Sequence, residues 1–219
     1  MSAGRNVYAV VPIKDPAQGK ARLSSVLSGE ERSELCVFFA RRTLETCAAA
    51  FGAERTLVVT ASAEIRLFAA ELGVQVVAED EGTGGLNAAI VLGAARANRE
   101  GAEALLVVPA DLPLASVDDL RAAARAVPDA PGCLLVPDRR NSGTNLLGLA
   151  PPREDLFAFG EHSLERHAEL AARAGCNVRI YTSAALALDV DLPEDFTEWR
   201  RRQEFAYAPG ASRALEKDP

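Results

Sequence analysis

Three cations follow the first predicted strand of this 219-residue chain. Residues 7–11 form an apolar run, and the loop after it carries Lys14, Lys20 and Arg22. A buried parallel strand brings its following loop to the ligand-binding edge of an open α/β sheet, so these side chains could hold an anion such as a polyphosphate. The loop is not a P-loop, because Lys14 stands where the first glycine should be and Ala21 where the hydroxyl should be. Loop cations are often merely solvated, so other motifs must decide.

Three aspartates carry the second set of reactive groups. Asp111 follows the apolar run at residues 104–108, and a strand there would bring its carboxylate to the same edge as the basic loop. Asp189 and Asp191 are two residues apart on a predicted extended segment and would project to one face, with Val190 on the other. Each could instead be a helix cap, a turn residue or a solvated strand end. With the basic loop, the carboxylates suggest Mg²⁺ and phosphate, because Mg²⁺ takes oxygen ligands and needs few carboxylates.

Three further loops combine glycine with hydrogen-bond donors. Residues 82–87 follow a strand and open a helix, so their amides could meet a base or a phosphate, although the segment is not Gly-x-Gly-x-x-Gly and could be a plain turn. Residues 139–145 are dense in donors between two apolar strands, which suits a carboxylate or phosphate or else a solvated hairpin. Residues 157–163 place Gly160 and Ser163 at a predicted helix start, where Ser163 could bind an anion or simply cap the helix.

Histidine and cysteine do not form the other common sites. His162 and His167 are the only histidines, and their spacing of five is not the i, i+4 spacing of a helical zinc pair. Each is therefore interpreted as substrate-facing or structural. The four cysteines contain no Cys-x-x-Cys pair and are interpreted as core residues of a protein in a reducing cytosol: Cys36, Cys47, Cys133 and Cys176.

Strands and helices alternate along the segments that must position these residues. The apolar patterns predict strands at residues 7–11, 55–60, 74–78, 104–108, 133–136, 146–149, 177–181 and 187–189. Helices are predicted at residues 28–50, 62–72, 86–98, 117–126 and 163–174 and from about residue 193. Repeated βαβ units imply an α/β fold of three layers, α/β/α, with a mostly parallel mixed sheet.

Composition limits the function classes. The net charge of −7 disfavours a nucleic-acid surface, so the expected partner is a small molecule. No apolar run reaches transmembrane length and no signal peptide is evident, which predicts a soluble cytoplasmic protein without a membrane partner. At this length, with 48% hydrophobic residues, we expect one domain over residues 1–205 and a polar tail over residues 206–219. The sequence leaves open a monomer or a homodimer.

Taken together, the motifs resemble a known family. The chain is similar to the guanylyltransferases of coenzyme F420 biosynthesis, which use 2-phospho-L-lactate or phosphoenolpyruvate, over roughly residues 7–197. Six motifs in the family's order carry the resemblance, at residues 11–14 with 19–23, 85–87, 109–113, 142–145, 159–163 and 188–195. The resemblance implies the three-layer nucleotidyltransferase fold of the nucleotide-diphospho-sugar transferase type.

The resemblance also implies roles for individual residues. The GTP-phosphate loop would comprise Pro12, Lys14, Lys20 and Arg22, and the guanosine side Gly85 and Asn87, with Pro109 also binding nucleotide. Lys14, Lys20, Arg22 and Asp111 would be catalytic, and Asp111, Asp189 and Asp191 would hold Mg²⁺. The phosphoenolpyruvate positions match Thr144, Gly160 and Ser163. Two residues depart from the family pattern: Ala21 replaces a hydroxyl residue near phosphate, and Leu164 replaces an aromatic residue.

The implied reaction needs charge neutralisation more than proton transfer. A phosphate oxygen of the acceptor would attack the α-phosphorus of GTP and release pyrophosphate, and that oxygen is already anionic at neutral pH. Aligned cations would then suffice without a general base. The acceptor could be phosphoenolpyruvate, 2-phospho-L-lactate or 3-phosphoglycerate. The alternatives are a nucleotidyltransferase for a sugar phosphate or molybdopterin, and a nucleotide-binding module that has lost catalysis.

Overall fold

A seven-stranded mixed sheet forms the centre of the molecule. The computed structural model describes residues 5–79 and 84–203. The strands run in the order β3-β2-β1-β4-β6-β5-β7, and β6 alone of these seven is antiparallel to its neighbours. Their bounds are β1 Val7–Pro12, β2 Thr56–Thr60, β3 Gln75–Ala78, β4 Ala104–Val107, β5 Gly132–Pro137, β6 Thr144–Ala150 and β7 Asn177–Ile180.

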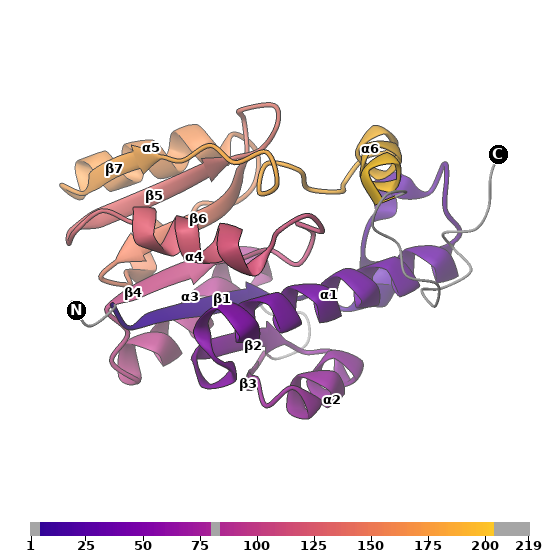
Figure 1. Ribbon diagram of the computed structural model, residues 1–219, viewed down its shortest axis with the longest axis horizontal. Helices are drawn as coiled ribbons and strands as arrows, with labels where there is room; N and C mark the ends of the chain where they lie inside the picture. Colours follow the sequence, from indigo (N-terminus) through magenta and orange to yellow (C-terminus); the bar gives the residue numbers. More distant parts are fainter. Residues whose placement is uncertain (1–4, 80–83, 204–219) are drawn as a thin grey trace.

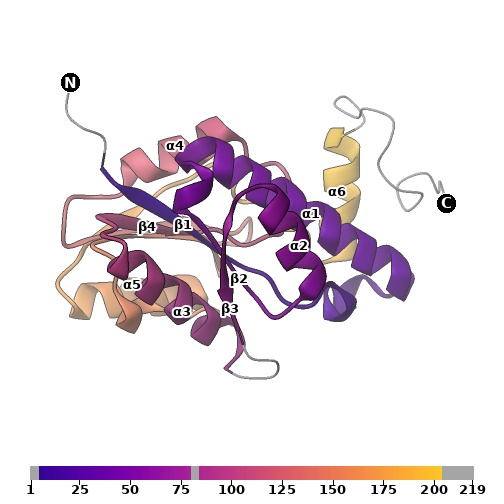
Figure 2. The ribbon, with the colours of Figure 1, turned by 90° about the horizontal axis from the view of Figure 1, so that it is seen from below.

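Helices cover both faces of this sheet, which confirms the predicted three layers. Figures 1 and 2 show α1, α2 and α4 on one face and α3 and α5 on the other. The buried residues of β1 alternate between the two apolar cores, as the two-residue period of a strand requires. The helix bounds are α1 Gly29–Phe51, α2 Ala63–Glu71, α3 Gly85–Arg99, α4 Val117–Ala126, α5 Ser163–Arg173 and α6 Pro193–Gln203.

Local signals explain where several helices begin. Ser28 accepts a hydrogen bond from the Glu31 amide while the Glu31 side chain accepts one from the Ser28 amide, so α1 starts with the predicted capping box. Ser116 and Asp119 form the same arrangement at α4. None of the helices in the described ranges is long and apolar enough to cross a membrane.

The last helix of the described residues, α6, packs against α1 and against two loops of the candidate edge. Figure 1 shows it set apart from the two helical layers, beside the N-terminal half of α1. A third apolar core joins α6 to α1, to the loop after β1 and to the loop that carries Asp189 and Asp191, through Leu23, Leu27, Leu35, Phe39, Leu188, Val190, Phe196 and Trp199. The basic loop and the acidic loop are therefore held by the same small core.

One predicted strand does not form. Residues 187–189 have no regular structure, because their apolar neighbours Leu188 and Val190 pack into this third core instead of joining the sheet. The predicted alternation of side chains is nevertheless confirmed. Val190 is fully buried in the third core, while the Asp189 side chain lies near Asp111 and Asp191. The four cysteines are free. Cys47 and Cys133 are buried as predicted, Cys176 is half-buried against one of the apolar cores, and Cys36 is half-buried on α1, outside the cores.

Candidate active site

The strand order places the candidate site between β1 and β4. The chain runs outward from β1 through β2 to β3 and then returns to β4 on the other side of β1. Such a reversal opens a crevice at the carboxyl ends of the two strands, where α/β proteins bind ligands. The basic loop follows β1 and Asp111 follows β4, so both predicted motifs lie at this crevice.

Lys20 lies between two of the predicted aspartates. Its Nζ is 2.9 Å from Asp111 Oδ2 and 2.8 Å from Asp191 Oδ1, and only 9% of its side chain is exposed. The residue has a left-handed backbone with φ of 52°, directly after Gly19. A Cβ on Gly19 would collide with Cys36 Sγ of α1, so this glycine lets the loop lie close against the helix. Of the three predicted cations, Lys20 is the one that the fold buries.

The charges in this cluster perturb one another. Burial opposes the charge on Lys20, but the neighbouring Asp111 and Asp191 outweigh burial and raise the pKa of the ammonium group. Burial raises the pKa of Asp189 to about 6, and the negative charges of Asp111 and Asp191 add to that increase. Two of the three carboxylates thus pair with the buried Lys20, and Asp189 lies beside them. Such a net negative cluster attracts a further cation.

Hydrogen bonds to the backbone fix the turn that carries Asp111. Arg42 of α1 donates from Nε to the Pro113 carbonyl at 2.7 Å, and the Val190 amide donates to the Asp111 carbonyl at 3.2 Å. The second bond ties the two acidic segments together directly. Sequence patterns gave no indication of Arg42, because its partner is a carbonyl 71 residues away.

Asn145 links the acidic cluster to β6. Its Nδ2 donates to the Leu186 carbonyl at 3.0 Å and lies 3.3 Å from Asp189 Oδ1. The side chain is almost fully buried, so these bonds hold the acidic loop against the sheet. Asn145 was predicted only as one donor of the loop at residues 139–145, whereas it lies in β6 and its side chain binds within the protein.

The residues of the predicted acceptor site also come together. Thr144, the first residue of β6, donates its backbone N–H to Ser163 Oγ at 2.9 Å, and its Oγ1 lies 2.9 Å from His167 Nδ1. Ser163 is the first residue of α5 and is not the cap, because His162 occupies the cap position. Gly160, with φ of 130°, makes the turn before the helix and its carbonyl accepts the Ser163 N–H at 3.2 Å.

The Asn87 side chain binds the backbone of Phe159, a contact that its sequence motif does not predict. Its Oδ1 accepts from the Phe159 N–H at 2.8 Å and its Nδ2 donates to the Phe159 carbonyl at 3.1 Å. The amide thus joins α3 to the loop that carries Gly160. Gly85 opens α3 with φ of 67°, while residues 82 and 83 of the predicted glycine-rich turn lie outside the described residues.

The remaining predicted residues line the same edge without joining the ion pairs. Lys14 and Arg22 are exposed, and Pro12 and Pro109 are half-buried at the ends of their strands. Burial raises the pKa of Glu79, and the charge of the Lys14 ammonium group partly opposes that shift. The Lys14 ammonium group is therefore within electrostatic range of Glu79, which follows β3.

Two arginines of the donor-rich loop at residues 139–145 pair with a carboxylate of the protein itself. Arg139 and Arg140 both pair with Asp195, at 2.8 and 3.2 Å, and the Asp195 side chain is fully buried at the start of α6. Asp195 also accepts the Leu192 amide at 3.0 Å. These guanidinium groups therefore hold α6 in place, which leaves them committed within the protein.

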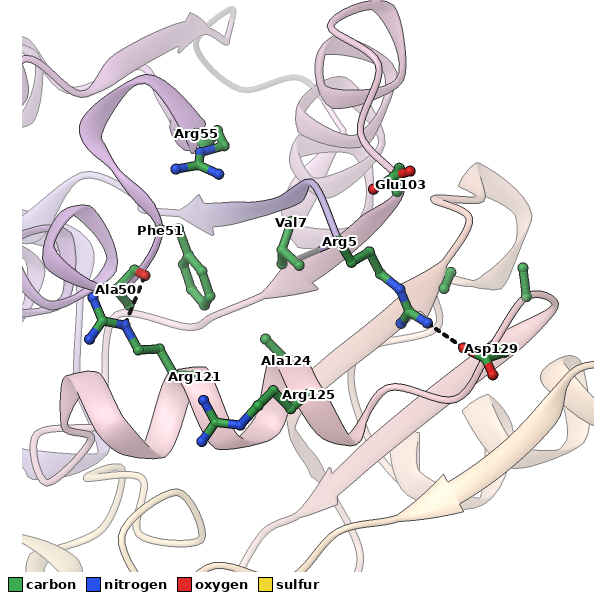
Figure 3. A pocket seen from close by; sticks show the side chains of 12 residues that line it. Arg5, Val7, Ala50, Phe51, Arg55, Glu103, Arg121, Ala124, Arg125 and Asp129 are labelled. Carbon is green, nitrogen blue, oxygen red and sulfur yellow. Dashed lines mark hydrogen bonds and ion pairs between the residues drawn. The ribbon is translucent and has the colours of Figure 1, made fainter. Parts of the chain in front are cut away.

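A hollow of about 910 Å³ lies at the opposite end of β1 and takes no part in this site. Figure 3 shows four arginines around it, from the chain before β1, from the segment after α1 and from α4. Arg121 donates to the Ala49 and Ala50 carbonyls, and Arg5 pairs with Asp129. Arg121 therefore caps the C-terminal end of α1, and Arg5 ties the chain before β1 to the loop after α4. The predicted reactive residues lie at the other edge of the sheet.

The donor set of the acidic cluster bears on the predicted Mg²⁺ site, which stays a prediction. Within residues 5–79 and 84–203 no three His, Cys, Asp or Glu side chains already stand together as a metal site. Lys20 nevertheless shows that a cation is accommodated between Asp111 and Asp191. The donors are carboxylate oxygens, which suit a hard ion such as Mg²⁺.

The order of motifs and the geometry agree with a comparison against protein families. Residues 7–202 match the family described as "Guanylyl transferase CofC like". The chain belongs to this family. It is therefore a guanylyl transferase, and the predicted resemblance and the predicted enzyme class, a nucleotidyltransferase, are both confirmed.

Relatives within the family are similar over most of their length. A phosphoenolpyruvate guanylyltransferase of Rubrobacter xylanophilus is 38% identical over 204 residues, covering 93% of this chain and 98% of that protein. One of Sphaerobacter thermophilus is 35% identical, covering 87% of this chain and 90% of that protein. One of Streptomyces coelicolor is 35% identical, covering 85% and 86%.

Solved structures confirm the predicted fold of this guanylyl transferase. A nucleotidyl transferase from Methanothermobacter thermautotroptrophicus superposes with a TM-score of 0.68 at 17% identity, covering 93% of this chain and all of that one. A cytidylyltransferase from Leptospira borgpetersenii gives a TM-score of 0.58 at 14% identity, covering 93% of this chain and 89% of that one. At such identities the likeness concerns the fold alone.

Proposed function

We propose that this guanylyl transferase moves GMP from GTP to the phosphate of a small phosphorylated carboxylic acid, phosphoenolpyruvate first among them, and releases pyrophosphate. The name shared by the relatives supports this acceptor. The observation that carries the proposal is the buried Lys20 bridging Asp111 and Asp191 at the β1–β4 crevice. In this proposal the reaction serves coenzyme F420 biosynthesis, as the sequence resemblance implies.

The chain's own residues would align two anions. Lys20, with the exposed Lys14 and Arg22 on the same loop, would supply positive charge where negative charge collects on the departing pyrophosphate. Asp111, Asp189 and Asp191 would hold Mg²⁺, which when bound neutralises phosphate charge and orients the phosphates for displacement. Thr144, Gly160 and Ser163 would hold the acceptor beside them, since Asn145 connects β6 to Asp189.

The bond changes balance without a proton shuttle. An oxygen of the acceptor phosphate forms a bond to the α-phosphorus of GTP, and the bond from that phosphorus to the β-bridging oxygen breaks. Pyrophosphate leaves with that electron pair. His167 is not positioned as a base for this step, because burial lowers the pKa of its ring to about 4 and both ring nitrogens already have partners.

Pyrophosphate release tests this proposal. We expect release with GTP and MgCl₂ and with one acceptor among phosphoenolpyruvate, 2-phospho-L-lactate and 3-phosphoglycerate, and loss of release on adding EDTA. The variant Asp111→Asn should lower turnover at least about 100-fold, because it removes a charge that the metal and Lys20 share. Its far-ultraviolet circular dichroism should match the wild type.

Other outcomes would point elsewhere. Release with a sugar 1-phosphate or molybdopterin instead would identify a different nucleotidyl acceptor. GTP binding without release for any acceptor would favour a binding module. Wild-type turnover in Asp111→Asn would contradict the role of the acidic cluster.

A further inference from the structure

His167 has a hydrogen-bonding pattern that fixes the position of its proton. The ring is buried, with 1% of the residue exposed, and Nε2 lies 2.9 Å from the backbone nitrogen of Ala158. A backbone N–H can only donate, so Nε2 must present a lone pair. Nε2 is therefore the unprotonated nitrogen of the ring.

The other ring nitrogen must then carry the proton. Burial lowers the pKa of His167 to about 4, with Arg166 adding to the effect, so the ring is neutral at physiological pH. A neutral imidazole has one N–H, which assigns the hydrogen to Nδ1. Nδ1 is 2.9 Å from Thr144 Oγ1 and donates to it.

Accepting that bond leaves the Thr144 hydroxyl hydrogen available. A hydroxyl has one hydrogen to donate and two lone pairs to accept with. Ser163 is in the same state, because its Oγ accepts the Thr144 backbone N–H. Thr144, at the start of β6, and Ser163, at the start of α5, are 6% and 3% exposed, so each hydroxyl belongs to a buried residue.

Surrounding contacts hold the imidazole in this orientation. The Phe159 ring meets it edge to face, with centroids 4.7 Å apart, and Asn87 fixes the Phe159 backbone with two hydrogen bonds. Flipping the ring by 180° would place a ring carbon at each of these two positions and lose both hydrogen bonds. The packing around the ring thus keeps Nδ1 against Thr144 Oγ1 and leaves the Thr144 hydroxyl free to donate.

We propose that His167 is a positioning residue that makes the Thr144 hydroxyl a hydrogen-bond donor to the carboxylate of the acceptor substrate. The inference rests on the proposed function. A carboxylate only accepts hydrogen bonds, so it matches two hydroxyls whose hydrogens are both free. The acceptor's phosphate must lie toward Lys20 to reach GTP, which leaves its carboxylate for Thr144 and Ser163.

Kinetics of two variants test the role. His167→Leu removes both ring nitrogens, whereas His167→Asn keeps an N–H donor where Nδ1 stands. We expect His167→Leu to raise the KM for phosphoenolpyruvate at least about tenfold while the KM for GTP stays within about twofold, because a hydrogen bond to a charged group is lost. His167→Asn should keep the KM for phosphoenolpyruvate within about threefold.

A double variant separates positioning from simple packing. In a Thr144→Val background, His167→Leu should cause no further rise in that KM, because the hydroxyl it orients is gone. Equal losses in His167→Leu and His167→Asn that follow their melting temperatures would overturn the proposal. So would an unchanged KM for phosphoenolpyruvate in His167→Leu.

Nitrogen NMR of the wild-type protein without substrate separates this inference from the proposed function. The ¹⁵N shifts of His167 should show a neutral ring protonated at Nδ1, and protonation at Nε2 would overturn the assignment even if guanylyl transfer is observed. If no acceptor supports turnover, the proposed function fails. In that case the affinity for phosphoenolpyruvate is measured by titration of the wild type and of His167→Leu, in place of the two KM values. Equal affinities would overturn the proposal.

Discussion

At the scale of single residues, the site combines charges that are costly to the fold. Asp189 is half-buried beside two other carboxylates, and the buried Lys20 pairs with those two and not with Asp189. Burial disfavours the charged form of Asp189, so this side chain lowers the stability of the folded protein when it is ionised. The presence of such a group at a ligand-binding edge points to a functional role.

The first residue-scale prediction concerns Asp189→Asn. The folded-state pKa is about 6, above the ordinary value of 3.8, so the folded protein holds this proton more tightly than the unfolded chain does. Stability therefore falls as pH rises from about 4 to about 6, and the loss persists above that range. Without divalent metal at pH 7, the variant should melt about 2–4 °C higher than wild type, and near pH 4 the two should coincide.

Differential scanning calorimetry at the two pH values provides the measurement. Asp195→Asn is the matched control, because Asp195 is buried between Arg139 and Arg140 and its replacement should lower the melting temperature instead. Asp189→Asn should also lose turnover. A variant that melts below wild type at pH 7 would contradict the account of the acidic cluster.

At the scale of elements, close packing of α3 on the sheet fixes the start of that helix near the site. A Cβ on Gly93 would lie 2.5 Å from Val10 Cγ1 and 3.0 Å from Val59 Cγ2. A glycine here lets α3 approach β1 and β2, and so sets the place from which Asn87 reaches Phe159.

Replacing that glycine tests the packing. Gly93→Val should destabilise the protein by about 1–3 kcal/mol, because the added atoms overlap two strands. It should also raise the KM for GTP or the acceptor by moving the start of α3. Urea unfolding measures the first effect, and Gly29→Ala, at an open helix start, serves as a control with little change. A Gly93→Val protein as stable as wild type would show that α3 can shift freely.

Most elements could be predicted because their signals are local. The apolar period of β1 or α1 and the capping box at Ser28 can be detected within a short window of sequence. The failed strand at residues 187–189 shows the limit of such windows. Its apolar side chains alternate as in a strand, but their partner is α6 and not a neighbouring strand.

The site was predictable to the extent that its residues follow strands. Asp111 and Lys20 meet because β1 and β4 are adjacent, which the alternating βα pattern favours. The Arg139 and Arg140 pairing with Asp195, and the Asn87 bonds to Phe159, join segments more than 50 residues apart. Composition alone does not contain that information, so these contacts were not predicted, and the nucleotide-binding role of Asn87 stays a prediction.

At the scale of the whole molecule, one sheet edge gathers the chemistry. The third core joins the basic loop, the acidic loop and α6, while Asn145, Thr144 and α5 complete the opposite side of the crevice. In the proposed reaction, each side would hold one of the two phosphorylated molecules. The single domain over residues 1–205 remains a prediction, and residues 206–219 of the predicted tail lie outside the described residues.

Phosphorus NMR of the reaction with GTP, MgCl₂ and phosphoenolpyruvate tests this account most directly. We predict two mutually coupled signals from a new pyrophosphate diester that joins GMP to the acceptor, together with the single line of free pyrophosphate. The signal of phosphoenolpyruvate should fall in step. GMP or GDP formed while phosphoenolpyruvate stays intact would contradict the account, because it would mean that water and not the acceptor attacks the nucleotide.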